Sequence, residues 1–341
     1  MNRPMRYFLT GATGFVGGRL LKQLLDEGHV VHALVRNRAK AGVIQEDAVQ
    51  RAGRLELVEG DITNKESMRL AMDGADGVYH CAAWYKVGSA AAKSAKEARA
   101  INVDGTRNVL ELMDELSIPK GVYVSTLAVN SDTKGVVVDE SYRFEGEHLC
   151  LYNQTKWEAH RKVVEPMMEQ GLPLVVVMPG IIYGPGDTSI LRPTIQKYLK
   201  RKLFALPKAP EYSWAHVDDV ANACVLAMQK GRVGEDYIIS GERYGFAAAF
   251  DLMHEITGVP APKRRFSPGT LRFFAGFMHA FTWMNPPEDF HPEVLRLSAE
   301  ATYLGNNSKA RSDLGYEPRS LRDGLKETLA GEMEELHMVM K

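Results

Sequence analysis

The sequence predicts an α/β fold, a doubly wound parallel sheet with helices on both faces, joined to a smaller C-terminal lid domain. Three observations support this prediction. Short apolar runs alternate with helical patterns through the first half of the chain. The apolar runs are almost uninterrupted, as strands buried on both faces require. A glycine-rich turn follows the first run and precedes the first helical pattern.

The elements of the first half follow from periodicity and from turn residues. Strands are expected at residues 6–10, 30–35, 55–59, 77–80, 121–125 and 174–178. Helices are expected between them, at residues 14–27, 65–72, 98–116 and 152–170. Repeated strand–helix–strand units connect parallel strands through right-handed crossovers, which places helices on both faces of one sheet.

The pattern changes after Met178, where glycines and prolines interrupt it. Residues 214–228 are interpreted as a return to the sheet, followed by a further strand at 237–240. The Pro-rich, aromatic stretch from about 245 to 310 shows no strand–helix alternation and is typical of a lid. The expected division is a first domain at 1–178, rejoined by about 212–240, and a lid with the C-terminal segment at 179–211 and 241–341.

Composition excludes several classes of protein. The 341 residues carry a net charge of −1, so a nucleic-acid partner is not expected. Three scattered cysteines exclude a disulfide framework, and the ten histidines contain no HExxH motif, so no metal is expected. No apolar segment precedes the first strand, which favours a cytoplasmic location. Cys150 lies two residues before Tyr152, and a reactive thiol there is the alternative to an inert one.

The stretch at residues 271–284 is rich in Phe, Met and Trp, but it is too short to span a bilayer. It also carries Arg272 and His279, so stable membrane insertion is not expected. A helix that covers a substrate pocket is the favoured interpretation, and shallow contact with a membrane is the alternative.

The glycine-rich turn predicts a dinucleotide site. Its glycines follow a GxxGxxG spacing between the first strand and the first helix. Such glycines allow a tight turn, let a pyrophosphate approach the backbone and permit close packing of helix on sheet. The helix N-terminus then favours the anion. The predicted contacts are Gly11, Thr13, Gly14, Phe15, Val16 and Gly17.

The end of the second strand favours NADP over NAD. An NAD enzyme usually places a carboxylate there for the ribose hydroxyls, whereas this strand ends in Arg36. The planar guanidinium suits a 2′-phosphate, and Arg38 or Lys40 could add a second cation. The alternative is that Arg36 merely caps a solvated loop. Asp61 and Ile62 follow the third strand, where an adenine would lie, and Ala82 and Ala83 follow the fourth. Asn102 is expected to bond the backbone near the active site.

Tyr152 and Lys156 begin a helix four residues apart, so the phenol and the ammonium project from one face. A free tyrosine has a pKa of about 10. A nearby cation lowers that pKa toward neutral pH, where the phenol can serve as a general acid or base. The pair lies one strand after Ser125 and Thr126 and downstream of the dinucleotide turn.

Together these motifs resemble the extended short-chain dehydrogenase/reductase family, the NAD-dependent epimerases and dehydratases. The segments TGATGFVG, HCAA, NVDGT, YVST, YNQTK, PGIIYGPGD and HVDDVA fall in the family's order over nearly the whole chain. The Val-Arg after the second strand is similar to the dihydroflavonol-reductase-like branch. The resemblance also implies a homodimer that packs the helices near 98–116 and 152–170 together.

The resemblance implies the role of each residue. Tyr152 would be the general acid or base, and Lys156 would bond the nicotinamide ribose. Thr126 would hold the substrate oxygen, with Ser125 as the alternative by one register. Pro179 and Gly180 would begin the loop that runs past the nicotinamide. Trp84 and Tyr85 would contact a ring-bearing or lipophilic substrate, although packing under the lid explains them as well.

The leading hypothesis is an NADPH-dependent carbonyl reductase or alcohol dehydrogenase acting on a small molecule. A sugar-nucleotide epimerase or dehydratase is the alternative, and a cofactor-sensing protein without turnover is a third. Two departures disfavour the sugar nucleotide: Met178 stands where many such enzymes carry Arg, and Val129-Asn130-Ser131 replaces their Val-Tyr-Gly.

Overall fold

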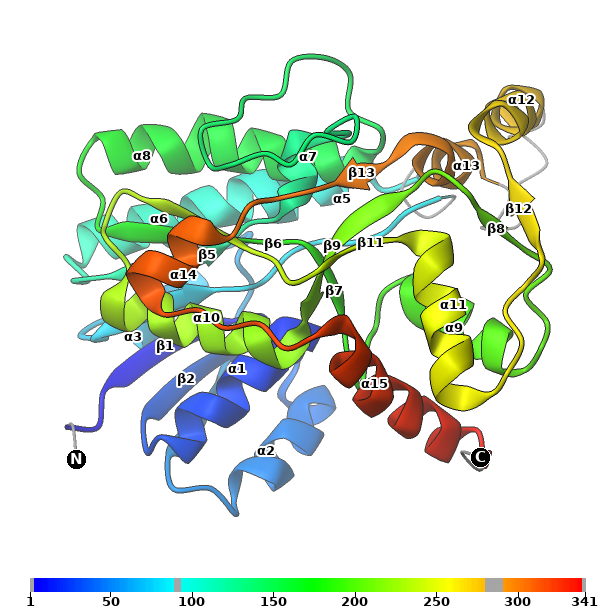
Figure 1. Cartoon of the computed structure of the whole chain (residues 1–341). Helices are drawn as coiled ribbons and strands as arrows, with labels where there is room; N and C mark the ends of the chain where they lie inside the picture. The colour runs from blue at the N-terminus through cyan, green and yellow to red at the C-terminus, as the bar shows by residue number, and fades with distance from the viewer. Residues whose placement is uncertain (1–2, 89–92, 280–290, 339–341) are drawn as a thin grey trace.

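The central sheet determines where a ligand can bind. The structure is a computed structural model that describes residues 3–88, 93–279 and 291–338. Its seven-stranded sheet has the order β3-β2-β1-β4-β5-β6-β10, with every strand parallel (Figure 1). The strands are β1 (Arg6–Thr10), β2 (Val30–Val35), β3 (Arg54–Glu59), β4 (Gly77–His80), β5 (Gly121–Val124), β6 (Leu174–Pro179) and β10 (Asp236–Ile239). The predicted doubly wound fold is confirmed, and its order reverses between β1 and β4, where such sheets bind ligands.

Helices cover both faces of this sheet (Figure 1). Alternate residues of a strand point to opposite faces, so Tyr7 and Leu9 enter one core and Phe8 enters the other. The first face carries α1 (Phe15–Asp26), α2 (Gly42–Ala48), α10 (Val217–Lys230) and α14 (Ser308–Leu314). The second carries α3 (Glu66–Met72), α5 (Ala95–Arg99), α6 (Thr106–Glu115), α7 (Leu151–Ala159) and α8 (Glu165–Glu169).

The two long helices of the second face are interrupted. A π-helical segment at Ala100–Gly105 joins α5 to α6, and another at His160–Val164 joins α7 to α8. Pro166 has no N–H for a continuous α-helix, and the second π segment ends just before it. The helices predicted at 98–116 and 152–170 therefore exist, each with a local change of pitch.

A second, smaller sheet lies beside the first. Its central strand β9 (Glu211–His216) pairs with β7 (Ile181–Tyr183), β11 (Arg243–Gly245) and β13 (Thr302–Tyr303). The interpretation of 214–228 as a return to the main sheet is thus wrong at its start, because Trp214 and its neighbours lie in β9. Only α10 and β10, which follow, belong to the main sheet. An apolar run shows that a strand is buried but does not show which sheet receives it.

The segments expected to form the lid, residues 179–211 and 241–341, contain more regular structure than their sequence suggested. The stretch 245–310 does alternate helices with strands, contrary to the prediction, but the strands are only two or three residues long. Such short strands carry no readable periodicity. The further elements of these segments are β8 (Ala205–Pro207) paired with β12 (Arg264–Phe266), and the helices α9 (Leu191–Leu199), α11 (Phe246–Thr257), α12 (Pro268–His279), α13 (Pro292–Glu300) and α15 (Leu321–Glu335).

The stretch predicted at 271–284 is helical as far as His279, and its remainder lies outside the described residues. Within the parts of the chain that the structure describes, no helix has both the length and the apolar character needed to cross a membrane.

Candidate active site

One cavity of about 1010 Å³ lies at the carboxyl ends of the parallel strands and extends between the sheet and the segments that carry β8, β12 and α12. The residues that the sequence singled out for cofactor, catalysis and substrate all line it. They are Gly11, Thr13, Gly14, Phe15, Val16, Gly17, Arg36, Asp61, Ile62, Ala82, Ala83, Trp84, Tyr85, Thr126, Tyr152, Lys156, Pro179 and Gly180. The fold therefore brings seven separate segments of sequence to one place.

The turn between β1 and α1 has no room for side chains at its glycine positions, which leaves its backbone open to a pyrophosphate. Gly11 has a φ of +78°, and a Cβ there would lie 2.7 Å from the Ala82 nitrogen. A Cβ on Gly17 would lie 2.1 Å from the Gly11 carbonyl oxygen. At the start of α1, Gly14 has no side chain that could cap the helix. The first backbone amides of the helix therefore face the cavity without a side-chain partner. These features fit the phosphates of a dinucleotide.

A buried hydrogen-bond chain fixes this turn from below. Thr106 donates its hydroxyl to the Asn102 carbonyl (2.7 Å), so its oxygen accepts from His80 Nε2 (3.0 Å). His80 Nδ1 then accepts from the Thr10 hydroxyl (2.7 Å), and Thr10 accepts from the Ala82 amide (3.2 Å). Burial lowers the pKa of His80 to about 3, so the ring stays neutral and keeps this tautomer. The sequence did not reveal this chain, because its members are joined only by the fold.

At the far end of β2, Arg36 is exposed and lines the cavity. Arg38 does not line the cavity, and its Nε donates to the Leu57 carbonyl (3.2 Å). The side chain of Lys40 lies outside what the structure describes. Asp61 accepts from both the amide and the hydroxyl of Thr63 (2.9 and 2.8 Å), which fixes the carboxylate after β3.

Of the predicted pair on α7, Lys156 is buried and Tyr152 is half-buried, and the lysine has partners that the sequence did not indicate. Lys156 Nζ donates to the Tyr123 hydroxyl (2.8 Å) and to the Val124 carbonyl (2.9 Å). Burial lowers the pKa of Lys156 to about 7. Burial also raises the pKa of Tyr152, while a hydrogen bond with Thr126 acts in the opposite direction. The tyrosine pKa is thus raised, contrary to the expected lowering, so Tyr152 is a neutral phenol that can donate a proton.

Ser125 and Thr126 face different partners. The Thr126 oxygen lies beside Tyr152 and accepts from the Ala128 amide (3.1 Å). The Ser125 hydroxyl lies 2.8 Å from His160 Nδ1. Since Ser125 is engaged by the imidazole, Thr126 is the hydroxyl better placed to share a substrate oxygen with Tyr152.

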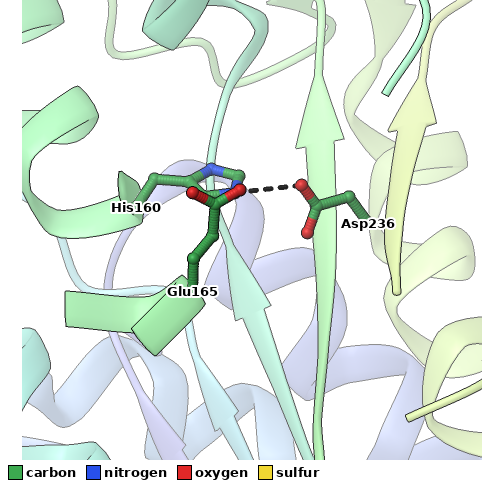
Figure 2. A group of neighbouring side chains, drawn as sticks. All are labelled: His160, Glu165 and Asp236. Carbon is green, nitrogen blue, oxygen red and sulfur yellow. Dashed lines mark hydrogen bonds and ion pairs between the residues drawn. The ribbon is translucent and has the colours of Figure 1, made fainter. Parts of the chain in front are cut away.

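His160 continues the face of Tyr152 and Lys156 by one more turn. Figure 2 shows its ring aimed at Asp236 of β10, with Glu165 of α8 close by. His160 Nε2 donates to the Asp236 carboxylate (3.0 Å), so the Nδ1 of a neutral ring accepts from Ser125. Burial disfavours the carboxylate, yet the hydrogen bond from His160 and the charge of Arg161 hold the pKa of Asp236 below its ordinary value.

His160, Glu165 and Asp236 have the composition of a metal site, but arginine already supplies the cation. Arg161 contacts Glu165 and lies 3.9 Å from Asp236. A second such group, His216, Asp218 and Glu327, is likewise flanked by Arg19 and Arg319. In both groups arginine side chains thus already neutralise the carboxylates that a metal ion would need.

The two aromatics after β4 have different surroundings. Trp84 is only 4% exposed and packs with Ala98. As expected, Asn102 bonds this segment, accepting from the Trp84 amide (2.7 Å). Tyr85 is 44% exposed, and its ring meets that of Tyr152 edge-on with centroids 4.8 Å apart. Packing therefore accounts for Trp84 in large part, whereas Tyr85 stands directly over the phenol.

Cys150 has no reactive character. Its thiol is buried and donates to Asn153 Oδ1 (3.1 Å), and burial raises its pKa to about 12. A thiolate is therefore strongly disfavoured at neutral pH.

Comparisons with known proteins agree with this geometry. The model of the NAD dependent epimerase/dehydratase family matches residues 7–240. The chain is 30% identical to the "Putative dihydroflavonol 4-reductase" of Synechocystis sp. over 338 residues, covering 94% of this chain and 92% of that protein. It is 31% identical to the 4-hydroxy-2-methyl-3-oxo-4-farnesyl-3,4-dihydroquinoline-1-oxide ketoreductase of Stigmatella aurantiaca, covering 92% of each.

Among solved structures, the UDP-glucuronic acid 4-epimerase of Bacillus cereus in complex with NAD superposes with a TM-score of 0.74 at 21% identity, covering 97% of this chain and 99% of that one. At this identity the likeness shows the fold alone. The family match and the reductase relatives show more: this chain belongs to the NAD-dependent epimerase/dehydratase family of extended short-chain dehydrogenases/reductases and is an NAD(P)-dependent enzyme of that family.

Proposed function

We propose that the enzyme is an NADPH-dependent reductase of a carbonyl group, or a dehydrogenase of the corresponding alcohol, on a ring-bearing or lipophilic small molecule. One observation carries this proposal: the cavity wall beyond Tyr152 is aromatic and apolar. It is formed by Tyr85, Leu206, Tyr212, Phe246, Phe266, Leu271, Leu295 and Tyr303. Apolar pockets with a few polar groups at one end orient hydrophobic ligands. The quinoline ring and farnesyl chain in the name of the Stigmatella relative agree with such a pocket.

The residues 179–211 and 241–341 are proposed to form the substrate-binding lid, because they supply most of this wall. The dinucleotide is proposed to lie along the glycine turn, with its 2′-phosphate on Arg36 and its nicotinamide beside Pro179 and Gly180. When bound, the nicotinamide supplies or accepts the hydride.

The polar residues at the end of the pocket have distinct tasks in this proposal. Thr126 and Tyr152 both donate hydrogen bonds to the substrate oxygen, which aligns the carbonyl and stabilises negative charge as it develops there. Tyr152 then gives its proton to that oxygen, and the Lys156 ammonium stabilises the resulting phenolate. Burial of Lys156, and the partial burial of Thr126 and Tyr152, strengthens these interactions, since bulk water screens them less.

Lys197 and Lys202 also line the cavity, at the lid end, and they favour the second candidate, a sugar-nucleotide epimerase or dehydratase with a diphosphate between the lysines. The decisive experiment supplies lipophilic cyclic ketones and a panel of nucleotide sugars in parallel, and follows NADPH absorbance and sugar stereochemistry. The proposal expects stoichiometric consumption of NADPH with a ketone. Epimerisation of a sugar without net NADPH change would replace the proposal by the second candidate.

A further inference from the structure

Helix α12 of the lid is apolar on two sides. Its inner face packs Leu271 and Ala275 against α13. Its outer face presents Phe273 and Phe274, which are 70% and 44% exposed, with ring centroids 5.9 Å apart. Phe277, one turn beyond Phe273, is 54% exposed. A surface helix of a water-soluble protein normally turns a polar face outward, so this outer face indicates a partner.

The segments around this face are cationic without any acid. Residues 188–210 contain six Lys or Arg and no Asp or Glu. Residues 256–287 contain four Lys or Arg and, again, no Asp or Glu. The whole chain has a net charge of −1, so the two segments concentrate positive charge that the rest of the molecule balances. The basic residues are Arg192, Lys197, Lys200, Arg201, Lys202, Lys208, Lys263, Arg264, Arg265 and Arg272.

The fold brings the two segments together. Strands β8 and β12 pair with Ala205 opposite Arg264, and the Lys208 amide donates to the Phe266 carbonyl (3.0 Å). Phe204 is 63% exposed and lies under the Arg264 guanidinium, whose Cζ is 4.3 Å from the centroid of the Phe204 ring. The strand β12 then leads directly into α12 (Figure 1). Exposed aromatics and cations thus lie on directly connected elements of the lid.

Only some of these charges are available to a partner, because Arg192 is already paired with Glu332 (2.7 Å) and with Glu335. Arg265 is paired with Asp251 (2.7 Å) and is left out of the surface. Lys200, Arg201, Lys208 and Lys263 are exposed, and no carboxylate of the described residues lies within ion-pair distance of them. We call the exposed set the lid surface, formed by Lys200, Arg201, Phe204, Lys208, Lys263, Arg264, Phe273 and Phe274.

We propose that the lid surface docks on an anionic lipid bilayer. Exposed phenylalanines enter the interface between headgroups and acyl chains, while lysines and arginines around them bind acidic headgroups. A second copy of this chain is a poorer occupant, because docking through the same face would bring cations against cations.

Docking would also connect the bilayer with the cavity. Phe204, Phe266 and Leu271 belong to the same lid elements and line the cavity. A lipophilic substrate dissolved in the bilayer could then pass into the cavity beneath the lid without crossing water. This last step rests on the function proposed above, whereas docking itself does not.

The test uses the full-length protein and needs no substrate. Sedimentation with vesicles of phosphatidylcholine alone is compared with vesicles of equal parts phosphatidylcholine and phosphatidylglycerol. Binding is expected to the anionic vesicles and to fall steeply as salt rises from about 0.1 M to about 1 M, where the Debye length shortens from about 10 Å to about 3 Å. The double variants Phe273→Ser/Phe274→Ser and Arg201→Glu/Lys208→Glu should each weaken partitioning by about tenfold or more.

Leu70→Ser is the matched control, because Leu70 is 91% exposed on α3, away from the lid, and should leave partitioning unchanged. None of the four substituted lid residues lines the cavity, so NADPH affinity should stay at the wild-type value and report correct folding. The proposal is overturned if the wild type remains in the supernatant with anionic vesicles. It is also overturned if the Phe double variant binds them as well as the wild type, or if that variant changes only the protein's own oligomeric mass.

Discussion

The two ends of the cavity differ in the atoms that form them, backbone atoms at one end and side chains at the other. The dinucleotide end is formed largely by backbone, in the turn where Gly11 and Gly17 leave no space for a side chain. The substrate end is formed by side chains such as Tyr85, Phe246 and Tyr303, which come from distant segments. A turn that has no room for a Cβ tolerates few substitutions, whereas a wall of side chains can change while the fold persists. The cofactor class is therefore a property of the family, and the substrate is a property of this chain.

The largest expected effect lies where the two ends meet. Tyr152→Phe should reduce kcat by about 10²–10⁴-fold, because the ring remains but the acidic proton is lost. NADPH affinity, measured by protein fluorescence, should stay within about twofold of wild type, as expected for a hydroxyl that acts on the substrate. Tyr85→Phe is the matched control, since it removes a hydroxyl from the neighbouring ring and should leave kcat nearly unchanged. A Tyr152→Phe enzyme with a normal rate would show that another group is the acid.

Gly17→Ala should abolish tight cofactor binding, because the new Cβ would lie 2.1 Å from the Gly11 oxygen and would displace the turn. Overpacking of this kind also costs about 1–3 kcal/mol of stability, visible as a lower Tm. Gly18→Ala is the control on the adjacent residue, where the nearest atom would be 3.4 Å away. That variant should bind NADPH normally and gain about 0.5–1 kcal/mol from the better helix former. Equal behaviour of the two variants would contradict the role given to the turn.

Arg36→Asp should weaken NADPH binding by roughly 10–100-fold, the value of about 1.5–3 kcal/mol for a charge-assisted hydrogen bond. NADH binding should be unchanged or tighter, because a carboxylate there accepts from the ribose hydroxyls. Titration of both reduced cofactors measures the ratio. Arg38→Asp is a useful comparison, since Arg38 bonds the Leu57 carbonyl and does not line the cavity. If the wild type bound NADH as tightly as NADPH, or more tightly, the proposed preference for NADPH would be wrong.

At the substrate end, Tyr85→Ala should raise KM for a cyclic ketone by roughly threefold to tenfold and leave NADPH affinity unchanged. The lost interaction is that of one aromatic ring, about 0.5–1.5 kcal/mol. Trp84→Ala should instead lower Tm, because Trp84 is packed against Ala98. A Tyr85→Ala enzyme whose NADPH affinity falls in step with its ketone affinity would mean that the two ends are not separable.

The smallest effect concerns protons. Burial holds the pKa of Lys156 near 7, so at about pH 8 most of this lysine is neutral in the free enzyme. A bound dinucleotide carries negative phosphates and ribose acceptors, which favour the ammonium and raise that pKa. Binding at pH 8 should therefore take up a fraction of a proton, and the uptake should vanish below about pH 6. Calorimetry in buffers of different ionisation enthalpy measures it, and Lys156→Met should abolish it.

The sequence predicted what depends on local rules. The glycine turn follows from spacing between a strand and a helix, and Tyr152 and Lys156 share a face because they lie four residues apart. Their position in a common cavity could thus be anticipated. The partners of these residues could not, because Tyr123 and Asp236 meet Lys156 and His160 only through strand order. For the same reason β9 was assigned to the wrong sheet: burial is local information, but the choice of neighbour is not.

The contact between His160 and Asp236 has a consequence for the order in which the protein can mature. The two residues are 76 positions apart, and the lid segment 179–211 is synthesised between them. A nascent chain ending at residue 178 would expose β6 as an open edge and leave His160 without its acceptor. The sheet of the first half is therefore completed only by β10, and a fragment released at residue 178 should be prone to aggregation through this edge.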